Sequence, residues 1–302
     1  MVIEQELMMG AEDQLEFAVI PAPVTTLKTI VLHVQNDSSV DRRLDTALSL
    51  ARASSAHLSC VHATPTQAYV VSDGYGGIFV MEDVLRVLEQ EDARLRSRIE
   101  RRLESEDVSW DYEQVSADVA ATVARRATLA DLIVAGRTPQ KDEFAAPATG
   151  LLGDLLFRAR TPIFIAGDEA RTVDPTGNAM IAWDGSPEAA NAVRSSLGLL
   201  KLASSVGVIE VAEEKSGPFP STALLEYLSR QGIHANLVVT DPPLDGSGHG
   251  GIVAALVAEA RAAGAAYMVM GGYGHSRLGE YVFGGVTRAL LSACPVPLVI
   301  AH

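Results

Sequence analysis

The chain has 302 residues and lacks the features that nucleic-acid-binding proteins need. Aromatic residues make up only 5% of it, and 24 Lys and Arg stand against 38 Asp and Glu, so the formal net charge is −14. A surface this negative repels a phosphate backbone, and few side chains are present to stack on bases. Nucleic acid is therefore not an expected partner. A charge-free run at residues 262–276 is interrupted by glycine and is too short to span a bilayer, so no membrane is expected either.

Cysteine and lysine are also scarce. The two cysteines, Cys60 and Cys294, are far apart and show no metal-ligand spacing, which favours a reducing compartment with both thiols in the core. None of the four lysines stands in a P-loop motif. The first 27 residues contain no basic residue, so we expect no secretion signal and a cytoplasmic protein.

Short β-branched runs alternate with helix-like segments along the whole chain. This order predicts an α/β fold of open parallel sheets whose strands are joined by crossover helices. Strands are expected at 28–34, 57–63, 108–115, 131–135 and 162–166, and again at 179–183, 206–211, 233–240, 266–270 and 297–301. Helices are expected near 39–54, 80–105, 118–129, 150–159, 187–202, 221–231, 252–263 and 285–292.

A shift of 135 residues lays one half of the chain on the other. Gly136 then falls on Gly271, Gly150 on Gly285, and the strand from Pro162 on the strand from Pro297. We interpret this as two tandem copies of one five-stranded unit, with extra residues in the first copy around 64–79. The predicted limits are an N-terminal extension at 1–24, a first domain at 25–168, a linker at 169–177 and a second domain at 178–302.

The last strand of each copy, at 162–166 and 297–301, is a natural edge of its sheet. Pairing these two strands would remove two exposed edges at once. We therefore expect an internal pseudo-dimer, and a homodimer of the whole chain is a further possibility that the sequence leaves open.

A glycine-rich loop follows the apolar strand that ends near Met270. Gly271, Gly274, Gly284 and Gly285 give the spacing G-x2-G-x9-G-G, and a helix is expected to start near Gly285. Glycines let backbone N–H groups approach a phosphate, and the helix N-terminus adds a positive dipole end. The alternative is a strand-to-helix turn that needs glycine for its backbone angles alone.

A second segment is expected at the same edge of the sheet, because ligands in open α/β sheets bind beyond the carboxyl ends of the strands. Asp184 ends the first strand of the second domain and is placed to accept a hydrogen bond from an amino group or a hydroxyl. Ser186 is the predicted N-cap of the next helix, with Pro187 at its first position. The alternative for this segment is a turn and helix cap without a ligand.

These motifs resemble the universal stress protein family, specifically its tandem members of the UspA-like type. The resemblance covers residues 178–302 and implies a Rossmann-like five-stranded sheet that binds ATP or AMP. It assigns Asp184 to the adenine and Gly271 and Gly274 to the ribose and phosphate region. It assigns Gly284, Gly285 and Val286 to the phosphates.

One departure from the family pattern concerns Gly285, which stands where the family has a Ser or Thr hydroxyl. Thr287 is a partial substitute for that hydroxyl. His275 and Arg277 lie in the loop, where they either meet phosphates or are simply solvated. No metal is expected beyond Mg²⁺ that accompanies a nucleotide.

The first domain fits the same fold but has lost the motif. Pro139 and Thr149 replace two of the glycines, and Gln35 stands in place of the acid that ends the first strand. Proline removes an N–H donor and fixes φ, which spoils a phosphate cradle. We interpret this half as a structural partner.

Two further signals carry little weight. Residues 245–251 contain a formal G-x-G-x-x-G, the dinucleotide-binding motif, but they follow the third strand of their domain rather than the first. We therefore prefer to interpret them as a loop that closes over the same crevice. His33 and His62 lie in apolar strands and are expected to be core residues.

The function predicted from these observations is adenine-nucleotide binding in a stress response, with little or no turnover. A scaffold or sensor for a protein partner or another small ligand stays open as an alternative, and a slow ATPase is a third.

Overall fold

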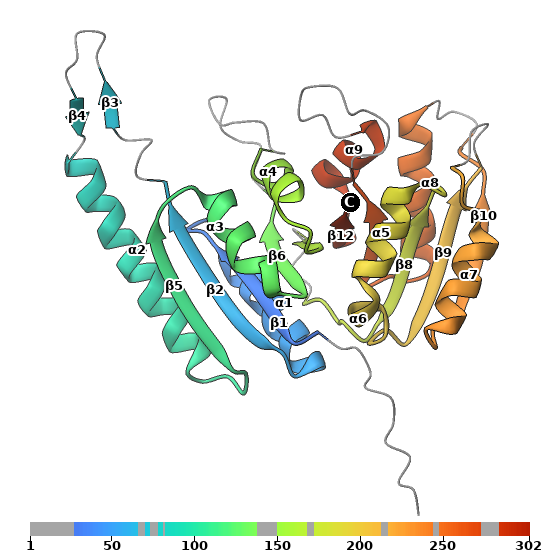
Figure 1. Cartoon of the computed structure of the whole chain (residues 1–302), viewed down its shortest axis with the longest axis horizontal. Helices are drawn as coiled ribbons and strands as arrows, with labels where there is room; N and C mark the ends of the chain where they lie inside the picture. The colour runs from blue at the N-terminus through green and yellow to red at the C-terminus, as the bar shows by residue number, and fades with distance from the viewer. Residues whose placement is uncertain are drawn as a thin grey trace, which may run out of the picture.

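The computed structural model shows a twisted sheet of ten strands with helices on both faces (Figure 1). It describes residues 27–65, 70–72, 78–80, 82–137, 150–167, 172–212, 217–243, 248–272 and 284–302. The strand order is β10-β9-β8-β11-β12-β7-β6-β1-β2-β5.

Each half of the sheet contains five parallel strands in the same relative order, because the first strand of each half lies between its second and its fourth. The repeat in the sequence predicts this shared strand order. In the first half the strands are β1 (Thr29–Val34), β2 (His57–Thr64), β5 (Trp110–Ser116), β6 (Leu132–Gly136) and β7 (Ile163–Ala166). In the second half they are β8 (Asn178–Trp183), β9 (Ser205–Val211), β10 (Ala235–Thr240), β11 (Tyr267–Gly271) and β12 (Leu298–Ala301).

The helices divide between the two faces of the sheet. One apolar core lies under α1 (Val40–Ser54), α2 (Glu82–Leu103), α5 (Pro187–Ser195), α6 (Leu197–Leu200) and α7 (Ser221–Arg230). The other lies under α3 (Val119–Arg126), the short 3-10 turn Ala127–Leu129, α4 (Gly150–Arg158), α8 (His249–Ala262) and α9 (Gly285–Ala293). Both cores contain residues of both halves, and strands buried on both faces explain their continuous apolar sequences.

The two halves join along β7 and β12, which pair antiparallel with Phe164 opposite Val299. Phe164 is fully buried, and its ring centroid lies 6.0 Å from that of Tyr267 in β11. The predicted pairing of the two last strands is confirmed. It converts two five-stranded sheets into one, so each half protects the edge of the other. The predicted domain limits stay predictions.

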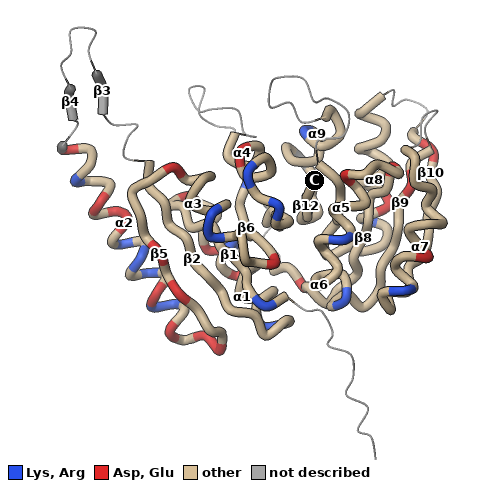
Figure 2. Tube along the Cα trace, viewed as in Figure 1, with Lys and Arg blue, Asp and Glu red and all other residues tan. Residues whose placement is uncertain are grey.

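The extra residues of the first half form a separate antiparallel hairpin, β3 (Val70–Ser72) with β4 (Ile78–Val80), which the sequence did not predict. The helix α2 follows it, with acidic and basic residues alternating along its length (Figure 2). Ion pairs such as Arg96 with Glu100, at 2.8 Å, hold that solvated face, while Leu95 and Ile99 are buried against the sheet. No described helix is long and apolar enough to cross a membrane.

Candidate functional site

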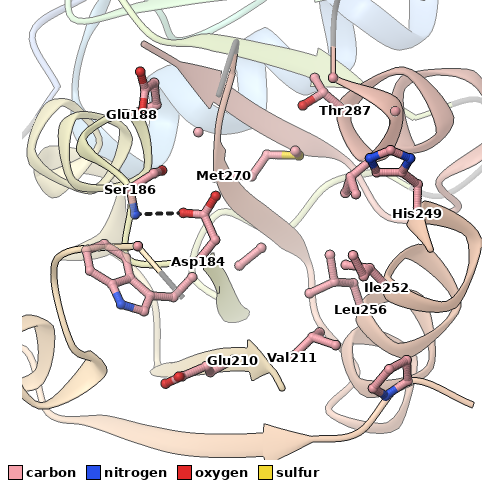
Figure 3. Close-up of a pocket in the computed structure, with 18 of the residues that line it drawn as sticks. Asp184, Ser186, Glu188, Glu210, Val211, His249, Ile252, Leu256, Met270 and Thr287 are labelled. Carbon is pink, nitrogen blue, oxygen red and sulfur yellow. Dashed lines mark hydrogen bonds between the residues drawn. The ribbon is translucent and has the colours of Figure 1, made fainter. Parts of the chain in front are cut away.

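A cavity of about 680 Å³ opens at the carboxyl ends of β8, β9 and β11 (Figure 3). It lies beside the boundary between β8 and β11, where the strand order of the second half reverses and where open α/β sheets bind ligands. Its wall includes Trp183, Asp184, Ser186, Glu188, Glu210, His249, Met270, Gly271, Gly284, Gly285, Val286 and Thr287.

The turn between β8 and α5 places the Asp184 carboxylate toward the cavity (Figure 3). The Ser186 N–H donates to Asp184 Oδ1 at 2.9 Å, which fixes the carboxylate while its other oxygen stays available. The Ser186 hydroxyl accepts from the Ala189 N–H at 3.1 Å, and Pro187 follows at the first helical position. The predicted N-cap is therefore confirmed, and the cap and the site share one turn.

Residues 217–219, which follow β9, hold this turn from outside. The Gly217 N–H donates to the Asp184 carbonyl at 2.8 Å, and the Phe219 N–H donates to the Gly185 carbonyl at 3.0 Å. A Cβ on Gly217 would lie 2.3 Å from the Gly185 carbonyl carbon, and Gly185 itself has a φ of +73°. Both glycines are thus required by this close backbone packing, which makes the position of Asp184 rigid.

Gly271, the last residue of β11, is required for a different reason. A Cβ there would lie 2.6 Å from the Ala189 backbone nitrogen. Gly271, Gly284 and Gly285 are not among the described glycines that have a positive φ. A turn that needs glycine only for its backbone angles therefore does not explain these three glycines. For Gly271, the explanation is the close approach of the Ala189 backbone.

The N-terminus of α9 forms the opposite wall. Gly284 is its N-cap, and Gly285, Val286 and Thr287 are its first three residues, so their N–H groups have no partner within the helix. Thr287 is only 6% exposed and lies on the first turn of α9, in the wall of the cavity. Gly274 and His275 lie outside the described residues.

His249 is the residue of this site that sequence reasoning missed. Apolar periodicity placed the start of α8 at Ile252, whereas the helix begins at His249, after Gly248 with a φ of +63°. The earlier start brings the imidazole into the cavity wall, against Gly285 (Figure 3). The available signal was the glycine-rich stretch 246–251 in front of an apolar helix, because glycine readily adopts a positive φ such as that of Gly248 just before the helix.

The cavity has two chemically different ends. Asp184, Glu188 and Glu210 supply carboxylates at the ends of β8 and β9 and on the first turn of α5. The N-termini of α8 and α9 supply backbone N–H groups and positive dipole ends on the other side. The described lining contains no Lys or Arg. This arrangement suits a ligand with hydroxyl or amino donors at one end and an anionic group at the other.

In the first half, a buried arginine holds the turn that follows the first strand. Arg43 is 1% exposed, and a Cβ on Gly136 would lie 2.4 Å from its guanidinium. The guanidinium donates to both carboxylate oxygens of Asp37, at 3.0 and 2.9 Å, and to the Gln35 carbonyl at 3.0 Å. Burial raises the pKa of Asp37, but the charge and hydrogen bonds of Arg43 oppose this, and the pKa of this carboxyl lies below its usual value.

The cause is the length of the turn. Residues 35–39 separate β1 from α1, whereas residues 184–186 separate β8 from α5. The longer turn places a guanidinium beside Gly136, while in the second half the helix backbone itself packs on Gly271. The first half therefore holds an internal ion pair where the second half packs the backbone of α5 on its glycine. Pro139 and Thr149 lie outside the described residues.

The histidines and cysteines of the strands belong to the core, as predicted. His33 and His62 are 2% and 3% exposed, and both thiols are buried. Burial, with the charge of Arg43, lowers the pKa of His33 to about 3. Among the described residues no cluster of three or more His, Cys, Asp or Glu could hold a metal ion.

No curated protein matches the chain. The model of the universal stress protein family matches residues 246–302. The resemblance to universal stress proteins is thereby confirmed. The matched segment begins at the glycines before α8 and includes α8, β11, α9 and β12, and of these α8, the end of β11 and the start of α9 line the cavity.

Solved structures extend the likeness in fold to nearly the whole chain. A universal stress protein from Archaeoglobus fulgidus DSM 4304 is 13% identical, with a TM-score of 0.66 over 92% of this chain and 97% of its own. A functionally unknown protein from Pseudomonas aeruginosa PAO1 is 16% identical, with a TM-score of 0.55 over 92% and 93%. The universal stress protein fold thus spans both halves in tandem.

Proposed function

We propose that this chain binds one adenine nucleotide, AMP or ATP, in the cavity of its second half, and that it acts in a stress response by binding rather than by turnover. The observation that carries this proposal is the two-ended cavity at the reversal of strand order. A carboxylate held in place by its own turn lies at one end, and two helix N-termini lie at the other.

Each part of the nucleotide has a matching part of the cavity in this proposal. Asp184 accepts a hydrogen bond from the adenine amino group or a ribose hydroxyl. The N–H groups of Gly285 and Val286 and the hydroxyl of Thr287 receive the phosphate. The volume of about 680 Å³ falls within the range of cavities that hold ligands of this size.

The charges of the wall bear on which nucleotide binds better. Because Asp184, Glu188 and Glu210 are all acidic, each added phosphate brings repulsion that only the helix N-termini oppose within the described lining. We expect AMP to bind without a metal ion and ATP to bind better with Mg²⁺ than without it.

Isothermal titration calorimetry with AMP and ATP tests the proposal. Asp184→Ala should weaken AMP binding about tenfold or more, the usual effect of losing one hydrogen bond to a charged acceptor. Asp184→Asn keeps an oxygen for the Ser186 N–H and so separates the charge from the shape of the turn. Glu226→Ala, on the exposed face of α7, makes the same change of charge away from the cavity and should bind as the parent does.

Two results would reject this function. One is the absence of heat with millimolar AMP and ATP. The other is an Asp184→Ala variant that binds like the parent, which would place any nucleotide elsewhere. Phosphate release from ATP at the rate of the protein-free buffer is the expected result for a binding protein, and release that Asp184→Ala abolishes would favour an ATPase instead.

A further inference from the structure

The imidazole of His249 and the bare backbone of Gly285 form a matched pair at the anion end of the cavity. A Cβ on Gly285 would lie 2.6 Å from His249 Nδ1, 2.7 Å from Cγ and 3.0 Å from Cε1. A side chain at 285 and the ring in this position therefore exclude one another. Glycine at 285 gives the ring its place at the first turn of α9.

The position of the ring matters because of what surrounds it. His249 is the first residue of α8, so its own backbone lies at one helix N-terminus while its ring reaches another. Thr287 lies on the same turn of α9 and in the wall of the same cavity (Figure 3). An imidazole can donate an N–H, as a hydroxyl does, so it suits a negatively charged oxygen at this point.

We propose that His249 is the side chain that determines binding of the anionic group, a phosphate or diphosphate, in this cavity, and that it does so in place of a hydroxyl at position 285. The proposal rests on the proposed function for the location of the ligand. It adds which residue recognises the phosphate and why glycine occupies position 285.

The first experiment uses inorganic pyrophosphate, so that it does not depend on adenine. The ring resonances of His249 are assigned in a long-range ¹H–¹⁵N spectrum by comparison with His249→Ala, and pyrophosphate is titrated into the whole chain. We expect the His249 signals to shift and saturate. The signals of His57, which is bound to Asp111 and Ser109 in the first half, serve as the reference and should stay in place.

The second experiment compares four proteins by calorimetry with AMP and with adenosine: the parent, His249→Ala, Gly285→Ser and the double variant. His249→Ala should weaken AMP about tenfold and leave adenosine unchanged, because only the phosphate is recognised by the ring. Gly285→Ser should displace the ring and weaken AMP too. The double variant should regain affinity to within about threefold of the parent, because the serine hydroxyl then has room.

The outcomes separate this inference from the proposed function. If pyrophosphate shifts His249 but neither AMP nor adenosine binds, the inference stands and the adenine proposal fails. If AMP binds but pyrophosphate leaves His249 unmoved, or if His249→Ala weakens AMP and adenosine equally, the inference is overturned while nucleotide binding stands. A double variant no better than Gly285→Ser alone would also count against the exchange of imidazole for hydroxyl.

Discussion

Replacement of Arg43 tests whether its buried guanidinium stabilises the turn between β1 and α1. In Arg43→Met the long apolar stem is kept and the charge is lost. Asp37, whose side chain is 14% exposed, then lies in the turn without its cation, and the carbonyls of His33 and Gln35 lose a donor. The change removes the polar contacts of the guanidinium and keeps the stem beside Gly136.

The expected magnitude follows from the burial of both partners, at 2% and 14% side-chain exposure. Removing one member of a buried ion pair costs about 3–5 kcal/mol, because the remaining charge is left uncompensated. With an m-value of about 3 kcal/mol/M in urea, the midpoint of unfolding should fall by roughly 1–1.7 M. Adding Asp37→Asn should restore about 2 kcal/mol, since the stranded charge is then gone.

The assay uses the two tryptophans, which report on separate halves. Trp110 lies in β5 of the first half and Trp183 in β8 of the second, so single-tryptophan variants follow each half in urea. The Arg43→Met shift should be seen with the Trp110 reporter. A shift below about 0.3 M, or a double variant as unstable as Arg43→Met, would refute the reasoning that a buried ion pair stabilises this turn.

Three further predictions concern stability. Because the pKa of His33 is lowered to about 3, the unfolded chain takes up a proton below its ordinary pKa and the folded chain does not. The free energy of unfolding should therefore decrease as the pH is lowered from about 6 to about 3. His33→Leu should make this pH dependence, measured by urea unfolding, less steep by up to about 1.4 kcal/mol per pH unit. An unchanged slope would contradict this. Gly271→Ala should lower the free energy of unfolding by about 1–3 kcal/mol in the same assay, because the new methyl group forces β11 and the Ala189 backbone apart. Gly250→Ala, whose methyl group meets open space, should cause no loss. Equal effects of the two substitutions would show that close packing is not the cause. Phe164→Ala, at the pairing of β7 with β12, should lower the free energy of unfolding by about 3–5 kcal/mol, and both tryptophan reporters should detect the loss. A loss confined to one half would show that the halves unfold independently.

Much of the fold was predictable because it depends on local patterns. All ten predicted strands of the main sheet are present within one or two residues of their expected ends, and the 135-residue repeat predicted the shared strand order. The antiparallel join of β7 and β12 followed from the need to protect two edges. Ser186 was predictable as a cap because its side chain acts within one turn.

The remaining features depend on distances that the sequence does not carry. The pair Arg42 and Arg43 reads as the solvated face of a helix, and only the five-residue turn before α1 brings the second arginine into the interior. The contact of His249 with Gly285 joins residues 36 positions apart, on helices whose relative position is set by the sheet. The roles assigned to Asp184, Gly271, Gly284, Gly285, Val286 and Thr287 stay predictions, although all of them line one cavity.

The central claim is that the cavity of the second half binds one adenine nucleotide per chain and that the first half binds none. Native mass spectrometry of the intact chain with AMP tests this claim most directly. We predict a single added nucleotide per chain, retained in Arg43→Met and lost in Asp184→Ala at the same AMP concentration. Two nucleotides per parent chain, or one that persists undiminished in Asp184→Ala, would contradict it.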